Sequence, residues 1–87
     1  MFAHTRAAAA ELAQYGIRVN GLVPGPFDTA LLRSQVSDPQ LPANVTMLQR
    51  VAHPDEAVGP ALLLTSDAGS FITGQILFVD GGYVVAR

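Results

Sequence analysis

The sequence has 87 residues, of which 49% are hydrophobic, with a formal net charge of −2 and no cysteine. This length predicts one small domain, the hydrophobic content argues against a disordered tail, and the absence of cysteine excludes disulfides and thiolate metal sites. Its basic residues are scattered arginines, its apolar runs are short and it opens without an apolar leader, so we expect a cytoplasmic protein that binds neither nucleic acid nor membranes.

The first predicted element is a helix over residues 2–15. Its alanine-rich sequence favours a helix, and Gly16 follows where a left-handed residue often ends one. No capping residue precedes Phe2, and we therefore expect this helix to have begun further upstream. The two histidines of the chain have no ligand-like spacing with other residues, so no metal site is predicted.

The second predicted element is a strand over Ile17–Val23, in which odd and even positions face opposite sides. Pro24 should end the strand, because proline lacks the N–H that the ladder needs. Either Asp28 or Thr29 then suits the N-cap of a helix that runs to about Val36. The two prolines of the following stretch, residues 37–42, predict a loop.

The last third of the chain predicts two more helices and a second strand. Residues 43–51 favour a short helix, and a longer one is expected over 54–66, with Pro54 at its first position and acidic residues in its first turn. Pro60 would interrupt that helix and predicts either a kink or a later start. A strand over Gln75–Val79 and a turn at 80–82 complete the chain.

The order helix, strand, helices, strand predicts parallel pairing and an α/β arrangement. Two strands are too few for a parallel sheet covered on both faces, so the sheet is expected to be incomplete. Ligands of such sheets bind at the carboxyl ends of the strands, where Pro24-Gly25-Pro26 lies. A glycine there lets backbone approach a flat ring, and Thr29 offers a hydroxyl beside a helix N-terminus.

Two segments, AAAAELAQYGIRVNGLVPGPFDT and PDEAVGPALLLTSDAGSFITGQILFVDGG, resemble the C-terminal part of the short-chain dehydrogenase/reductase family. The resemblance runs from about Thr5 to Gly82. It implies a Rossmann-type, doubly wound parallel sheet, of which this chain supplies two strands and about four helices. Residues 1–87 would then be the C-terminal part, roughly the last third, of a single NAD(P)-binding domain. Residues 30–53 would be its substrate lid.

The resemblance also implies site residues. Pro24 and Gly25 would line the nicotinamide, the Phe27 backbone would meet its carboxamide, and Thr29 would hydrogen-bond the carboxamide or the pyrophosphate. The position of Phe27 is usually Val or Ile in the family. Several apolar side chains could line a substrate pocket or equally belong to ordinary core, and Leu31 and Leu32 are the substrate candidates among them; the others are Val36, Val45, Met47 and Leu48.

The family moves hydride between NAD or NADP and a small carbonyl or alcohol, with a Gly-rich phosphate turn and a Y-x-x-x-K pair. Neither motif occurs here, and the chain has no lysine at all. No catalytic residue is therefore predicted, and these 87 residues alone are expected to be inactive. The family resemblance further implies a homo-oligomer formed through residues 54–82. The alternative is a non-catalytic interaction module that pairs with full-length relatives.

Overall fold

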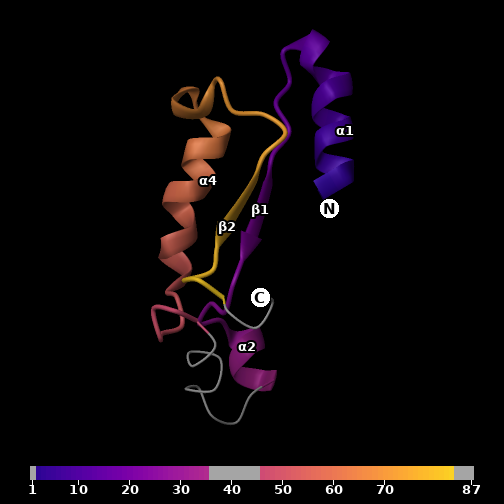
Figure 1. The fold of residues 1–87 in the computed structure, drawn as a ribbon. Helices are drawn as coiled ribbons and strands as arrows, with labels where there is room; N and C mark the ends of the chain where they lie inside the picture. Colours follow the sequence, from indigo (N-terminus) through magenta and orange to yellow (C-terminus); the bar gives the residue numbers. More distant parts are fainter. Residues whose placement is uncertain (1, 36–45, 84–87) are drawn as a thin grey trace.

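The structure, a computed structural model, describes residues 2–35 and 46–83. Within these residues, two short strands lie between helices (Figure 1). In chain order the α-helices and strands are α1 (Phe2–Leu12), β1 (Gly21–Pro24), α2 (Ala30–Gln35), α4 (Val58–Thr65) and β2 (Ile76–Val79). Single 3₁₀ turns occur at Ala13–Tyr15, Pro54–Ala57 and Asp67–Gly69.

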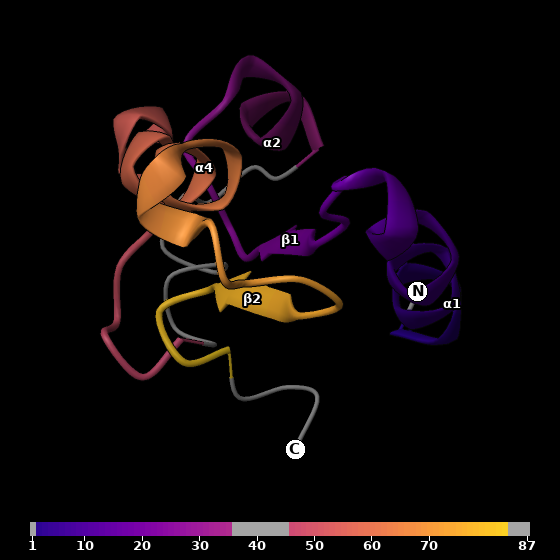
Figure 2. The ribbon, with the colours of Figure 1, turned by 90° about the horizontal axis from the view of Figure 1, so that it is seen from above.

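The two strands form a parallel two-stranded sheet, in a register that pairs Gly21 with Ile76 and Pro24 with Val79. Seen from above, α1 and α4 lie on opposite sides of this sheet (Figure 2). Leu22 faces α4, where it lines a small cavity with Ala61 and Leu64. The predicted α/β class, parallel pairing and incompleteness of the sheet are thus confirmed.

Helix α1 meets the sheet through small residues and one pair of rings. Ala9, which is buried, lies 3.5 Å from the position that a β-carbon on Gly74 would take. Arg6 Nη1 donates to the Gly74 carbonyl at 3.2 Å, and the Phe2 and Phe78 rings are 6.1 Å apart. The 3₁₀ turn after α1 ends at Gly16, whose φ of 73° is the left-handed conformation that glycine adopts without strain. The predicted helix and its cap are confirmed.

The first strand is shorter than the predicted Ile17–Val23, because it begins only at Gly21. Before Gly21, one backbone bond, from Gly74 N to the Val19 carbonyl at 2.7 Å, and bonds from the Asn20 and Thr73 side chains join the two segments. Val19 N donates to Thr73 Oγ1 at 3.1 Å, and Asn20 bonds the Ile72 carbonyl and the Gln75 N–H, both at 3.0 Å. The strand ends at Pro24, one residue later than predicted.

The predicted helix over 43–51 is wrong over residues 46–51, where the backbone is not helical. Thr46 instead forms an antiparallel bridge with Tyr83, and Ala52 a parallel bridge with Phe27. Pairing with chain segments far away in sequence has outweighed local helix propensity here. The predicted loop at 37–42, together with residues 43–45 and Val36, lies outside the described residues.

The segment leading into α4 follows the expected start signals. Pro54 opens a 3₁₀ turn with Asp55 and Glu56 behind it, and His53 is the N-cap. The α-helix itself begins at Val58, so Pro60 is its third residue, where a backbone N–H has no partner within the helix. The proline therefore causes a later start rather than a kink.

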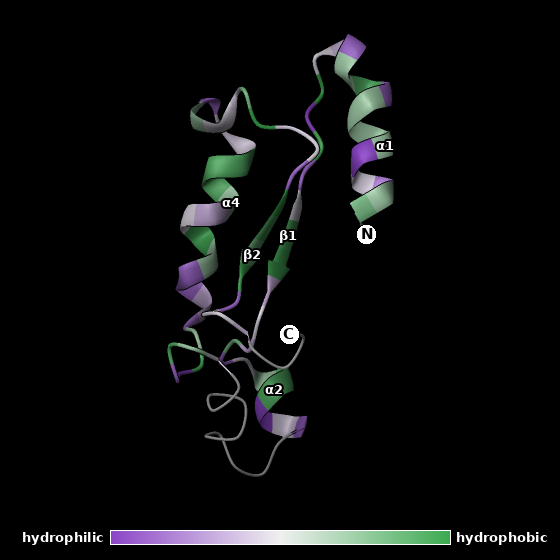
Figure 3. Ribbon diagram, viewed as in Figure 1, coloured by the Kyte–Doolittle hydropathy of each residue, from purple (hydrophilic) through white to green (hydrophobic). Residues whose placement is uncertain are grey.

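Little apolar surface is covered in this arrangement. Ala9 is the one buried apolar side chain among the described residues, although β2 is hydrophobic along its length and β1 in its middle (Figure 3). The accessible surface is 6077 Å², whereas a compact monomer of the same mass exposes about 4,900 Å². The carboxyl ends of the two strands lie side by side at one end of this open sheet (Figure 1).

Candidate functional site

The turn after β1 is held against the end of β2. Gly25 N donates to the Val79 carbonyl at 2.9 Å, which continues the parallel ladder one residue past Pro24. A β-carbon at position 25 would lie only 2.7 Å from Asp80 Cα and 2.8 Å from Asp80 Cβ. The neighbouring strand end therefore requires glycine here, independently of any ligand.

Beyond the turn, Phe27 forms an isolated parallel bridge with Ala52. Its two hydrogen bonds flank Phe27: Ala52 N donates to the Pro26 carbonyl at 2.9 Å, and Asp28 N donates to the Ala52 carbonyl at 2.7 Å. In a parallel bridge of this kind the N–H and C=O of the central residue point to the other edge. Within residues 2–35 and 46–83, no protein group occupies these two Phe27 groups.

Thr29, rather than Asp28, caps α2. Thr29 Oγ1 accepts from Leu32 N at 3.2 Å, as an N-cap side chain does. Asp28 instead pairs with Arg33 Nη1 at 3.2 Å, and both side chains of that pair are exposed. Since the Thr29 oxygen is the acceptor in its cap bond, its hydroxyl proton is left to donate elsewhere.

An open cleft of about 780 Å³ lies at the carboxyl ends of the strands. Its walls come from the turn after β1, from α2 and from the end of β2, and they are mainly apolar. The residues that line it are Val23, Pro24, Gly25, Pro26, Leu32, Phe78, Asp80 and Tyr83. It thus holds one carboxylate and one phenol among hydrophobic side chains.

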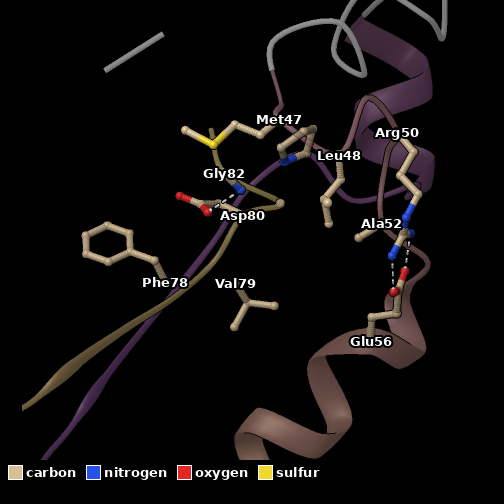
Figure 4. A pocket seen from close by; sticks show the side chains of 11 residues that line it. Met47, Leu48, Arg50, Ala52, Glu56, Phe78, Val79, Asp80 and Gly82 are labelled. Carbon is tan, nitrogen blue, oxygen red and sulfur yellow. Dashed lines mark hydrogen bonds and ion pairs between the residues drawn. The ribbon is translucent and has the colours of Figure 1, made fainter. Parts of the chain in front are cut away.

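A second cavity, of about 450 Å³, lies beside the first and shares Pro26, Phe78 and Asp80 with it (Figure 4). Asp80 turns back on its own loop, where its Oδ1 accepts from Gly82 N at 3.0 Å. Arg50 and Glu56 form a two-pronged ion pair on the opposite wall, with N–O distances of 2.7 and 2.6 Å.

The Arg50–Glu56 pair fixes the charge state of both groups. The hydrogen bonds from Arg50, followed by the bond from the His53 backbone, lower the pKa of Glu56 from 4.5 to about 2. The same contact raises the pKa of Arg50. Glu56 is therefore a carboxylate at any physiological pH, and it is also the acceptor that closes the capping box at His53.

The residues that the sequence singled out are only partly gathered in one place. Pro24, Gly25 and Leu32 line the larger cleft, while Phe27 and Thr29 follow directly in the chain without lining it. Leu31 is 67% exposed and lies outside both cavities, and Met47 and Leu48 line the smaller one.

Phe78, Asp80 and Tyr83 also line the larger cleft, although they were not among the predicted site residues. The signal was available, because ligands bind outside the carboxyl ends of parallel strands and β2 also ends there. Among the described residues there is no cluster of side chains suited to a metal ion. None of the described helices is long and apolar enough to cross a membrane.

Comparison with known proteins covers nearly the whole chain. A family model described as enoyl-(acyl carrier protein) reductase matches residues 1–84. The 5-keto-D-gluconate 5-reductase of Escherichia coli K12 is 41% identical over 85 residues, which are 94% of this chain and 34% of the relative. The chain therefore spans about a third of the length of the curated relatives it matches.

Solved structures agree in fold. A short-chain type dehydrogenase/reductase from Mycobacterium marinum has a TM-score of 0.87 and 37% identity, covering 97% of this chain and 33% of its own. ElxO, solved with NADP bound, has a TM-score of 0.82 and 26% identity, covering 99% of this chain and 36% of its own. The family match over residues 1–84 agrees with these likenesses, and the chain belongs to the short-chain dehydrogenase/reductase family.

Proposed function

We propose that this chain forms the nicotinamide side of the active site of an NAD- or NADP-dependent oxidoreductase, which acts on a small carbonyl or alcohol. The observation that carries the proposal is the Phe27 peptide. Its N–H and C=O have no protein partner among the described residues and lie just past the carboxyl end of β1. A carboxamide has an acceptor oxygen and N–H donors, so the backbone N–H and C=O of a single residue can bind it through two hydrogen bonds.

The neighbouring residues fit the same group. Pro24 and Gly25 border the cleft beside Phe27 and would lie against the ring. The Thr29 hydroxyl retains a donor for the carboxamide oxygen or the pyrophosphate. The bound cofactor would supply or accept the hydride. The role of this chain is to orient the nicotinamide and to cover one side of it.

Proton transfer has to come from other groups. The family's Tyr-Lys pair is not among these 87 residues, which include no lysine. Without it, no proton donor with a lowered pKa serves the carbonyl oxygen. We therefore expect no hydride transfer by these residues alone, in the cytoplasm or in a purified preparation.

The other parts of the chain receive supporting roles in the same proposal. Residues 30–53 would act as the substrate lid, and Leu32 faces the larger cleft from it. Leu31 would contact a substrate only after a change in the conformation of the lid. Residues 54–82 would form a subunit contact, because they expose several large apolar side chains: Val58, Leu62, Leu63, Phe71 and Phe78. These residues together would form part of a single cofactor-binding domain.

A chimera tests the proposal. Residues 1–84 replace the matching third of the E. coli reductase, and nicotinamide binding is followed by fluorescence titration. The Phe27→Pro variant removes one donor and should weaken cofactor binding about tenfold or more. Phe27→Val, which keeps the N–H, should bind as the parent does. Equal affinity in both variants contradicts the role given to Phe27.

The exposed apolar residues also support a second candidate, an interaction module that pairs with full-length relatives. Mixing the purified chain with an intact family member and separating the mixture by size exclusion tests it. Co-elution in a fixed ratio supports the module, whereas independent elution at micromolar concentrations rules it out.

A further inference from the structure

Glu56 joins the two sides of Ala52. Its Oε1 and Oε2 accept from the Arg50 guanidinium at 2.6 and 2.7 Å, and Oε2 also accepts from His53 N at 2.8 Å. Arg50 lies two residues before Ala52 and His53 directly after it. The backbone of Ala52 is therefore held from both directions by one carboxylate.

The other end of this segment is also fastened. Thr46 Oγ1 bonds both the N–H and the carbonyl of Arg50 at 3.2 Å. The next two residues bond the final turn, through Met47 N to the Gly82 carbonyl at 2.8 Å and Leu48 N to the Gly81 carbonyl at 3.1 Å. Residues 46–56 thus form a strap between the end of β2 and the start of α4.

This strap reaches the Phe27 backbone through Ala52. Ala52 bonds the Pro26 carbonyl and the Asp28 N–H, the groups on either side of Phe27. With both neighbouring peptides held, rotation of the Phe27 N–H and C=O is restricted. We propose that Arg50 and Glu56 are a positioning pair, which holds Ala52 so that the Phe27 peptide is presented to a nicotinamide carboxamide. This inference rests on the proposed function.

The Arg50–Glu56 pair should contribute little to the overall folding free energy of the chain. Its side chains are 53% and 39% exposed, and exposed ion pairs contribute little to global folding. The sheet is paired through other groups, such as Gly21 N with the Gln75 carbonyl and Gly25 N with the Val79 carbonyl. A change at Glu56 should therefore act locally, on Ala52 and the residues that it binds.

Amide hydrogen exchange of the chain, followed by NMR, tests the first part of the proposal, that the pair holds Ala52 in place. Glu56→Gln should speed exchange at Ala52 N and Asp28 N about threefold or more, with Gly21 N and Gly25 N unchanged. Asp67→Asn is the matched control, since it removes a charge at an exposed residue of the 3₁₀ turn after α4, away from Ala52. Arg50→Lys keeps the charge but loses one of the two hydrogen bonds to Glu56. Its exchange rates at Ala52 N and Asp28 N should lie between those of Glu56→Gln and the parent.

The pH dependence of amide exchange distinguishes a positioning role of Glu56 from a general structural role. Because the pKa of Glu56 is lowered to about 2 in the fold, its contribution is complete above 4.5 and is lost as the pH falls towards 2. Exchange at Ala52 N and Asp28 N should accelerate over that window in the parent, relative to Gly25 N. In Glu56→Gln this relative acceleration should be missing.

Cofactor kinetics test the other half, in the chimera with the E. coli reductase. Glu56→Gln should raise the KM for the nicotinamide cofactor about threefold, with kcat little changed, and Asp67→Asn should leave that KM unchanged. Unchanged exchange at Ala52 N and Asp28 N, or equal acceleration at all four amides, overturns the positioning pair. A parent chimera that binds no cofactor overturns the proposed function instead. Faster exchange confined to Ala52 N and Asp28 N would then still support the claim that the pair holds Ala52.

Discussion

Gly25 shows how one residue can satisfy two demands. The sequence suggests that glycine lets the turn approach a flat ring. The structure supplies a reason within the protein, because a β-carbon there would meet the backbone of Asp80 at 2.7 Å. The glycine therefore lets the ends of β1 and β2 meet, and the ligand contact is a separate proposal.

Gly25→Ala should therefore destabilise the protein. Forcing a methyl group against backbone costs about 1–3 kcal/mol of folding free energy. Gly59→Ala is the matched control, because nothing lies within 4 Å of a β-carbon there and alanine favours the helix. Urea denaturation followed by circular dichroism should show opposite shifts. A Gly25→Ala midpoint equal to the parent's would remove the steric argument.

Among the elements, those with strong local signals were predictable from the sequence. The run of alanines followed by Gly16 predicts α1, and Pro54 followed by two acidic residues predicts the 3₁₀ turn that leads into α4. The first strand begins four residues later than predicted, because Ile17–Asn20 bond mostly through the Asn20 and Thr73 side chains, with one backbone bond from Gly74 N to the Val19 carbonyl. Residues 46–51 were missed as bridges, since their partners lie far away in sequence.

The same limit applies to the candidate site. The turn at residues 24–26 could be placed from its prolines, its glycine and the end of a strand. The Arg50–Glu56 pair and the Phe27–Ala52 bridge could not, because neither spacing points to a contact before the fold is known.

Asn20 offers the clearest test at this scale. Its amide bonds Ile72 and Gln75, in the loop that leads into β2. Asn20→Leu should leave both partners unmatched and cost about 1 kcal/mol or more. Gln14→Leu is the control, since Gln14 bonds only the Glu11 carbonyl three residues away on an exposed helix end. Equal melting temperatures of the two variants would argue against a stabilising role for the Asn20 bonds to Ile72 and Gln75.

At the scale of the whole molecule, uncovered apolar surface is the main property. The chain exposes 6077 Å², about a quarter more than expected for a compact monomer of its mass. A standard interface buries about 800 Å² on each partner. The excess, about 1,200 Å², is larger than that share, as expected for a sheet of only two strands.

Phe71 is the residue to change in a test of self-association. Its side chain is fully exposed within residues 54–82. Phe71→Ser should raise the dissociation constant of a homo-oligomer about tenfold, as loss of an aromatic interface residue does. Tyr15→Ser is the matched control outside this segment, at a side chain 69% exposed. Sedimentation velocity measures both, and identical weight-average masses for the two variants would contradict the contact.

The separation of the two strands in the chain has a consequence for biosynthesis. Each rung of the ladder joins residues about 55 positions apart, as the Asn20–Gln75 bond does. Helix α1 can form from neighbouring residues as soon as they emerge from the ribosome, but β1 cannot pair with β2 until β2 has been translated. Throughout that interval the edge of β1 that faces β2 is unpaired and is a target for chaperones.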